Sequence, residues 1–437
     1  MIASVQRNLY VSVILWAIQC VILCLATQSM SVGIFQIFLM ILIYLQVKDN
    51  VPLFINLFVI GQYVILMFYL YWIFGYENSY FLGLKSDDYY FDVIWSSSFL
   101  EKYGINPFKL PQHLNSIEPG LGVLHNSKGY VYLIIVLKHI GSFIGGYNTL
   151  LPRVLNMYFL TMLAFKSSEI SFVYFKDKKL SVITSKAVFF FPVLLFVSAH
   201  IFRDTLIAYL LVSIFENIKC RKISIANILA TLIFLLPLFF LRTTTFVLAI
   251  IIAIFLYMQK EKIDWKLILL AAVGIYVFII LLPDNAAKTI REIEGYTALN
   301  KVRFGTYGTA VFSLPFYAGF IPRIVYLVTT PVPSVTSFYQ FFVSLSTYLQ
   351  LMFLPYLIRG LVIKNQLISL KIVFLLFFLG VAFTTADFRH VTMYIPFMII
   401  LALGGWRHFG MNRLDKYVRL SSMFFILMVV DGLILFL

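Results

Sequence analysis

The chain has 437 residues, of which 61% are hydrophobic and only 12% are charged. Lysine and arginine outnumber aspartate and glutamate by 34 to 19, which gives a formal net charge of +15. These cations lie at the ends of long apolar segments, where membrane proteins carry them, and therefore do not indicate a nucleic-acid partner. The composition excludes a soluble globular domain and indicates an all-α polytopic membrane protein.

An apolar segment of about 17 to 25 residues crosses the hydrocarbon core of a bilayer as a helix. About a dozen segments approach this length, and the shorter ones suit helices packed inside a bundle. They are Leu9–Ala26, Val32–Val47, Val51–Gly75, Leu150–Phe165, Ala187–Phe202, Thr205–Ile218, Ile225–Leu241, Thr243–Met258, Leu267–Pro283, Val335–Tyr356, Lys371–Thr385, Val391–Trp406 and Ser421–Leu437. We therefore expect residues 1–437 to form a single integral membrane domain of about 11 to 13 transmembrane helices, the first of them a retained span.

Basic loops of membrane proteins stay in the cytoplasm. Five lysine- and arginine-rich clusters become cytoplasmic together if the N-terminus is cytoplasmic; they lie within 166–186, 219–222, 260–266, 359–371 and 407–419. Two long segments, 76–149 and 284–333, then become external loops. The apolar segment Tyr130–Ile144 would reverse this order if it were a span, so we expect it to be a juxtamembrane helix at the outer face.

The same topology gathers a second set of charged residues at the outer ends of the spans. Its members are Asp87, Asp88, Asp92, Arg153, Arg203, Asp204, Arg242, Asp387, Arg389 and His390. Ionisable groups near membrane depth are expensive and usually face a cavity or a partner, so their convergence predicts a functional site. The alternative for any single residue is an interfacial anchor or a structural ion pair, such as Arg203 with its neighbour Asp204.

Several short motifs accompany these charges in a fixed order. Ser86-Asp87-Asp88-Tyr89-Tyr90 follows a span; Gly104-Ile105-Asn106-Pro107-Phe108, Lys128-Gly129-Tyr130 and Arg153-Val154-Leu155-Asn156 come next; Phe191-Pro192 through Ser198, Arg203-Asp204, and Arg389 through Tyr394 complete the order. This arrangement resembles the GT-C superfamily of membrane glycosyltransferases, which includes protein O-mannosyltransferases and lipid A aminoarabinose transferases. The resemblance covers most of the chain, although each motif is short.

The resemblance implies a GT-C-like bundle with an external juxtamembrane-helix loop. It also implies a sugar donor carried on a polyprenyl phosphate, a glycan acceptor that enters from the outer face, and an acidic base in the first external loop. Transfer to a hydroxyl group needs a carboxylate near the acceptor, and either Asp87 or Asp88 meets that need, with a slight preference for Asp88. The neighbour would then cap a helix or hold a cation or an arginine.

The departing phosphate needs fixed cations, and arginine binds phosphate oxygens bidentately. The candidates for this role are Arg203, Arg242 and Arg389, followed by Arg153, with Asp204, Asp387, His390, Tyr89 and Arg303 as supporting residues. No spacing of His, Cys and Asp resembles a zinc site. A divalent metal at Asp87 and Asp88 stays open, because paired carboxylates are suitable oxygen ligands.

Two other functions remain as alternatives. An O-antigen or capsule polymerase would take its glycan from a polyprenyl pyrophosphate, and the basic loop 284–333 partly fits that function. A flippase or transporter is less favoured, because mid-span positions almost lack charged residues. The composition is typical of a multi-pass enzyme of surface-polysaccharide or lipopolysaccharide assembly in the bacterial inner membrane, with an N-terminus in the cytoplasm and an active site outside.

Overall fold

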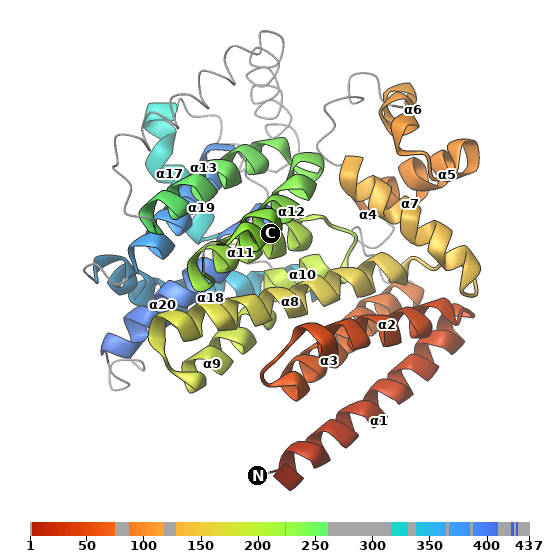
Figure 1. Cartoon of the computed structure of the whole chain (residues 1–437), viewed down its shortest axis with the longest axis horizontal. Helices are drawn as coiled ribbons and strands as arrows, with labels where there is room; N and C mark the ends of the chain where they lie inside the picture. The colour runs from red at the N-terminus through yellow and green to blue at the C-terminus, as the bar shows by residue number, and fades with distance from the viewer. Residues whose placement is uncertain are drawn as a thin grey trace. The chain divides into compact units, whose positions relative to one another are not determined.

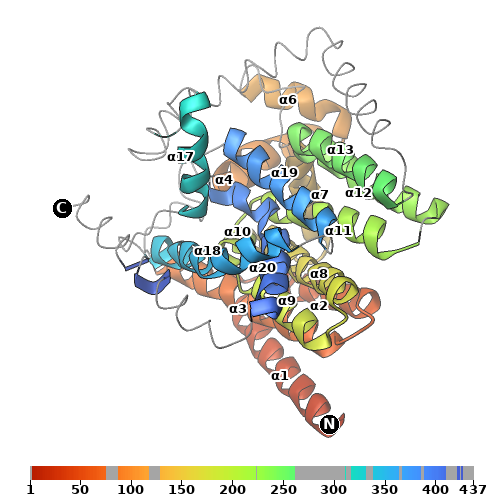
Figure 2. The same cartoon turned by 90° about the vertical axis from the view of Figure 1, so that its left-hand side faces the viewer.

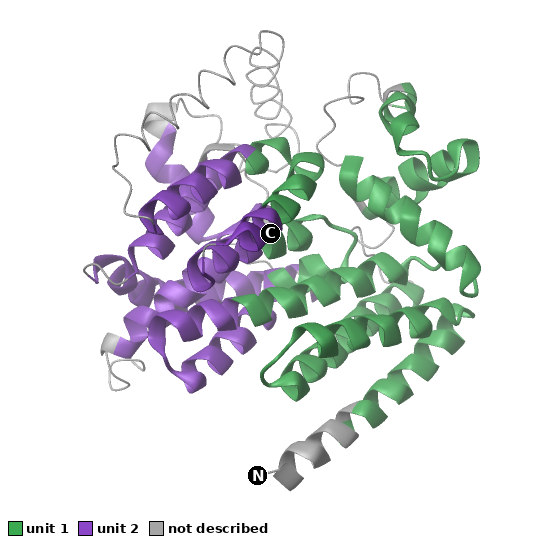
Figure 3. Cartoon of the chain, in the orientation of Figure 1, with its two compact units in different colours: residues 1–166, 194–210, 232–246 green, residues 167–193, 211–231, 247–437 purple. Residues whose placement is uncertain are grey.

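The computed structural model describes residues 2–74, 87–117, 128–222, 224–260, 311, 316–330, 338–363, 367–384, 388–409, 421–423 and 425–426. Every regular element within these ranges is helical, which confirms the all-α prediction (Figure 1). The chain divides into two compact units (Figure 3). Unit 1 comprises Met1–Lys166, Leu194–Leu210 and Leu232–Phe246, and unit 2 comprises Ser167–Val193, Leu211–Thr231 and Val247–Leu437.

Within the described residues, fewer helices are able to cross a membrane than the sequence indicated. In the described part of the chain, three helices are long and apolar enough: Val51–Ile73, Thr243–Lys260 and Gln340–Val362. A fourth span results if α9 (Lys178–Phe189) and α10 (Pro192–Ala199), bent by 52°, act as one. Hydropathy alone overestimated the count, because it does not reveal where a helix bends or ends.

Several of the predicted spans are apolar helices of only 15 to 17 residues. They are α2 (Ser31–Gln46), α11 (Asp204–Cys220), α12 (Ile225–Leu241), α19 (Ile368–Thr384) and α20 (Ile395–Phe409). At a rise of 1.5 Å per residue, such helices fall short of the roughly 30 Å of a typical hydrocarbon core. The predicted segments Leu267–Pro283 and most of Ser421–Leu437 lie outside the described residues.

Unit 1 begins with three packed helices, α1 (Ile2–Thr27), α2 and α3 (Val51–Ile73), which lie side by side in Figures 1 and 2. Their contact surface contains polar links within an otherwise apolar environment. The Gln36 side-chain amide donates to Gln62 Oε1 at 3.1 Å, and Cys20 Sγ donates to Gln36 Oε1 at 2.6 Å. Hydrogen bonds between helices hold apolar surfaces in register where lipid offers no hydrophobic driving force.

The first external loop predicted from the sequence is mostly helical where it is described. It contains α4 (Asp87–Tyr89), the π-helical segment η1 (Tyr90–Ser97), α5 (Ser98–Tyr103), the short turn η2 (Pro107–Lys109), α6 (Leu110–Ile117) and α7 (Lys128–Phe143). Gly104 links α5 to η2 with a φ of 61°, a left-handed conformation that favours glycine. Helix α7 corresponds to the predicted juxtamembrane helix, and it packs against η1, α5 and α6.

Charged and polar residues lie at three helix ends or links of unit 1. Helix α8 (Leu150–Phe175) begins with Arg153 in its first turn. The link between α10 and α11 contains His200 and Arg203, and the link between α12 and α13 (Thr243–Lys260) consists of Arg242 alone. Each of these positions lies at a helix end, where backbone groups lack partners within the helix and polar side chains find bonding opportunities.

Unit 2 contains α9, α17 (Phe316–Val328), α18 (Phe338–Val362), α19, η3 (Phe388–Met393) and α20. Helices α18 and α20 cross closely through two glycines. A Cβ atom on Gly405 would lie 2.0 Å from the carbonyl oxygen of Tyr356, and one on Gly360 would lie 2.2 Å from that of Leu401. Small residues at such a crossing let the two backbones approach each other, as in many membrane bundles.

We predict that Gly405→Ala destabilises unit 2 by about 2 kcal/mol, because the new methyl group overlaps backbone that cannot move independently. Gly380→Ala is the matched control, since its Cβ would meet only the end of the Leu248 side chain at 3.4 Å. The midpoints of thermal unfolding in detergent measure both changes. Equal midpoints for the two variants would contradict the close crossing.

Candidate functional site

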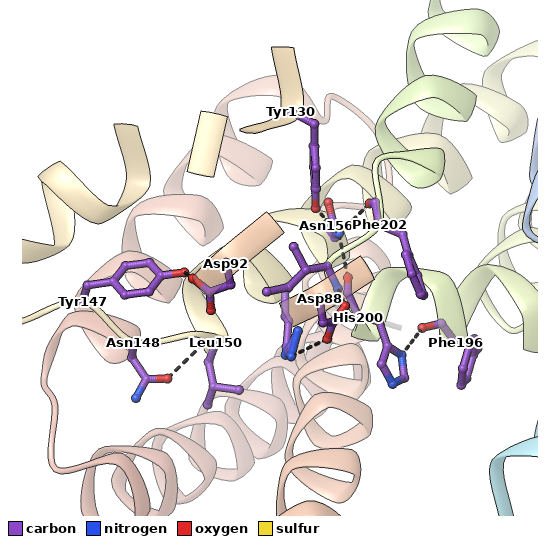
Figure 4. A network of polar contacts seen from close by, with 12 residues as sticks. Asp88, Asp92, Tyr130, Tyr147, Asn148, Leu150, Asn156, Phe196, His200 and Phe202 are labelled. Carbon is purple, nitrogen blue, oxygen red and sulfur yellow. Dashed lines mark hydrogen bonds and ion pairs between the residues drawn. The ribbon is translucent and has the colours of Figure 1, made fainter. Parts of the chain in front are cut away.

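The centre of the candidate site is an ion pair between Asp88 and Arg153. Arg153 Nη2 donates to Asp88 Oδ2 at 2.6 Å, and both side chains are fully buried. The other carboxylate oxygen, Asp88 Oδ1, accepts a hydrogen bond from the backbone N–H of Ile201 at 2.8 Å. Asp88 therefore ties together three segments that are far apart in sequence, and Figure 4 shows it between them.

The start of α8 is attached to the α10–α11 link a second time, through Asn156. Its side-chain nitrogen lies 2.9 Å from each of three acceptors, the carbonyl oxygens of His200 and Phe202 and the hydroxyl of Tyr130 (Figure 4). Asn156 is 1% exposed, so these bonds satisfy carbonyl groups that water does not reach. The link that carries Arg203 is thus fixed at several points.

A second acidic residue, Asp92, has its own partners. Lys138 Nζ lies 2.7 Å from Asp92 Oδ1. The Tyr147 hydroxyl donates to the same oxygen at 2.7 Å, as Figure 4 shows. Lys138 also donates to Ser97 Oγ at 3.0 Å and lies 4.0 Å from the ring centroid of Tyr147. Burial and the adjacent Asp92 carboxylate raise the pKa of Tyr147 well above its usual value, so this phenol remains a hydrogen-bond donor.

Asp92 lies in the π-helical segment η1, where its backbone carbonyl oxygen accepts hydrogen bonds from serine side chains. The hydroxyl groups of Ser96 and Ser97 donate to the carbonyl oxygen of Asp92 at 2.7 and 3.1 Å. Short π-helical segments are uncommon and occur frequently at functional sites. The segment places Asp92 beside Lys138, which interrupts the otherwise apolar helix α7.

The third acid, Asp204, lies in the first turn of α11 and pairs with Arg242. Arg242 Nη2 is 3.5 Å from Asp204 Oδ1, and both side chains are at most a tenth exposed. Arg203, the sequence neighbour of Asp204, donates to the carbonyl oxygen of Leu241 at 2.9 Å. Two arginines from different links therefore meet at the end of α12.

His200 is buried among aromatic rings next to this network. Its Nδ1 is 2.7 Å from the carbonyl oxygen of Phe196, and its ring lies 4.3 Å from that of Phe196 and 5.1 Å from that of Phe68. The side chain therefore packs against the same aromatic residues that line the α10–α11 link.

The structure thus brings Asp88, Arg153, Arg203, Asp204 and Arg242 together in unit 1. Tyr89 follows Asp88 on α4, with its ring against that of Tyr90. The backbone of Asp87 begins α4, whereas its side chain lies outside the described residues. Arg389 and His390 belong to η3 of unit 2, and both Asp387 and Arg303 lie outside the described residues.

Four residues of the network were not predicted as site residues: Lys138, Tyr147, Asn156 and His200. Lys138 had a sequence signal, since a charge interrupting an apolar helix needs a buried partner. Asn156 lay within the Arg153–Asn156 motif. Tyr147 and His200 gave no signal, because their roles depend on segments that are distant in sequence.

Among the described residues, no group of three or more His, Cys, Asp or Glu side chains is close enough to hold a metal ion. Both oxygens of Asp88 already accept from Arg153 and Ile201. A divalent cation at the Asp87–Asp88 pair would therefore share the Asp88 carboxylate with two buried hydrogen-bond donors. Comparison of the chain with protein-family models, with curated proteins and with solved structures found no match.

We predict that removal of one member of the central pair is strongly destabilising. Asp88→Asn and Arg153→Met should each lower the free energy of unfolding by about 3 to 5 kcal/mol, because each leaves a buried group without its counter-charge. The double variant should lose less than the sum of the two losses. Thermal unfolding of detergent-solubilised protein measures all three.

The control for this cycle is Arg221→Gln, which breaks the ion pair between Arg221 and Glu216. The Arg221 side chain is 47% exposed, so this pair contributes little to stability. The pair would not be a structural centre if Asp88→Asn and Arg153→Met each lowered the free energy of unfolding no more than the control does, and if their losses were additive.

Proposed function

We propose that this protein is a membrane glycosyltransferase of the GT-C type. It transfers a sugar from a polyprenyl-phosphate-linked donor to a glycan acceptor, such as O-antigen, lipopolysaccharide or capsule. The observation that carries the proposal is the convergence, in one unit, of an acidic loop after a membrane span with arginines from two helix links. The reaction needs a carboxylate to take the proton and cations to stabilise the phosphate leaving group. Both kinds of group must therefore lie near the same depth of the bilayer.

We assign the role of base to Asp87 in place of Asp88, which the sequence slightly favoured. Asp88 holds Arg153 and the Ile201 N–H with its two oxygens and is fully buried, so it has the structural role predicted for one member of the pair. Asp88 and Arg153 then act as positioning residues that fix the backbone of the base.

In the proposed reaction, the acceptor hydroxyl oxygen attacks the anomeric carbon of the donor sugar while Asp87 removes the hydroxyl proton. The bond between the anomeric carbon and the phosphate oxygen breaks, and the polyprenyl phosphate leaves with the electron pair. A single displacement of this kind inverts the anomeric configuration and needs no covalent intermediate. Cations stabilise the negative charge that develops on the phosphate.

Arg203 and Arg242 are suited to stabilise that charge. Arg203 is held by the carbonyl oxygen of Leu241 and Arg242 by Asp204, so both guanidinium groups are positioned before the substrate arrives. The guanidinium group presents its N–H donors in a planar fork that matches the geometry of phosphate oxygens. The participation of Arg389 from unit 2 remains a prediction, as do the bundle of 11 to 13 spans and the location in a bacterial inner membrane.

The decisive experiment compares Asp87→Asn with the wild-type enzyme in a deletion strain complemented with each gene. Asparagine keeps the size of the side chain but removes the basic carboxylate. We expect the rate of sugar incorporation into the surface glycan to fall by ~100-fold or more, as is typical for loss of a general base. Membrane insertion and the unfolding midpoint should stay unchanged, unlike those of Asp88→Asn.

Analysis of the glycan from the same strains distinguishes the alternatives. Loss of a side-branch sugar supports transfer of single sugars, whereas loss of long chains indicates a polymerase. Normal glycan in the Asp87→Asn strain would refute the proposed mechanism.

A further inference from the structure

The C-terminal half of α12 exposes a stripe of apolar side chains in unit 1. Along the last two and a half turns the exposed side chains are Leu232, Ile233, Leu236, Phe239 and Phe240, at 54, 67, 62, 40 and 42% of their full exposure. The opposite side, with Leu235 and Leu238, is buried. The spacing of three and four residues places the exposed side chains on one helix face over about 12 Å. A stripe of this kind suits contact with hydrocarbon chains.

The stripe ends beneath a lysine. Lys128, the first residue of α7, has its Nζ 5.9 Å from the ring centroid of Phe239 and 5.8 Å from that of Phe240. The neighbouring Gly129 packs so closely that a Cβ atom there would lie 2.7 Å from Phe240 Cβ. The ammonium group is therefore held over the end of an apolar surface, an arrangement that complements a lipid with a negatively charged head.

Two more cations meet at the same turn of α12. Arg242 follows directly after the helix, and Arg203 donates to the carbonyl oxygen of Leu241. Asp204 lies 3.5 Å from Arg242 and positions its guanidinium group. Arginine binds phosphate oxygens bidentately, so this helix end suits a phosphate group.

We infer that α12 and the start of α7 form the docking site of the polyprenyl phosphate in the membrane. The first part of the polyprenyl chain lies along the stripe from Phe240 towards Leu232, and its phosphate lies between Lys128 and Arg242. This assignment rests on the proposed function for the identity of the lipid. It adds a path for the lipid chain and gives Lys128 the role of a phosphate ligand, next to the arginines that stabilise the leaving group.

Lys128→Gln tests the head of the site, with full-length protein in phosphatidylethanolamine nanodiscs and undecaprenyl phosphate as the probe. We expect the variant to bind the probe about tenfold more weakly, because a charge-assisted contact is lost. Lys102→Gln is the matched control, since Lys102 also lies over an aromatic ring of unit 1, at 5.2 Å from the ring centroid of Tyr103, but away from the stripe. The control should bind like the wild type.

Photo-crosslinking tests the path of the chain. A benzoylphenylalanine replaces either Leu236 or Ile14, which are similarly exposed at 62 and 59% but lie on α12 and α1. In nanodiscs of phosphatidylglycerol with a small fraction of undecaprenyl phosphate, Leu236→benzoylphenylalanine should capture the polyprenyl lipid several-fold above its share of the bilayer. The variant at Ile14 should capture the two lipids in proportion to their amounts.

The outcomes separate this inference from the proposed function. Proportional capture at both positions, together with unchanged binding by Lys128→Gln, would overturn the docking site while leaving the role of Asp87 intact. Absence of undecaprenyl phosphate binding by the wild type would overturn the proposed donor and the docking site together. If the wild type binds undecaprenyl phosphate selectively but the Asp87→Asn variant still makes normal glycan, the proposed function is wrong and the lipid site stands.

Discussion

The buried pair of Asp88 and Arg153 is the interaction on which the rest of unit 1 depends. Two fully buried charges lose the hydration they would have in water, and the loss is tolerable only if each charge has a close counter-charge and further hydrogen bonds. Asp88 meets this condition through Arg153 Nη2 and the N–H of Ile201. The position of the acidic loop, the first turn of α8 and the α10–α11 link are therefore mutually dependent.

The same constraint recurs twice around this centre. Asp92 takes Lys138 and Tyr147 as partners, and Asp204 takes Arg242. In each case the partner comes from an element remote in sequence, so that every pair closes a large loop of chain. Three such closures give the candidate site a fixed geometry, which catalysis requires because a base or a cation acts only when it is held in place before the substrate binds.

Five of the residues named from the sequence lie in unit 1, namely Asp88, Arg153, Arg203, Asp204 and Arg242, but the sequence did not predict the contacts that each one makes. Asp204 lies 3.5 Å from Arg242, and Arg203 donates to the carbonyl oxygen of Leu241. Neighbouring side chains on a helix point apart, so partners are set by tertiary packing, which local spacing does not encode. The all-α class followed from composition, but the number of membrane-crossing helices did not, since Pro192 and the ends of short helices are invisible to an average of hydropathy.

The lysines and arginines that indicated topology also have a structural task in unit 2. Arg407 donates to the carbonyl oxygen of Phe175, Lys260 to that of Ile218 and Lys371 to that of Ile363, each at or near the C-terminal end of a helix. The last carbonyls of a helix lack intrahelical partners and carry partial negative charge, so a cation both bonds them and complements the dipole. Helix α11 unites both arrangements: it begins at Asp204, which holds an arginine of the candidate site, and its last turn is bonded by Lys260.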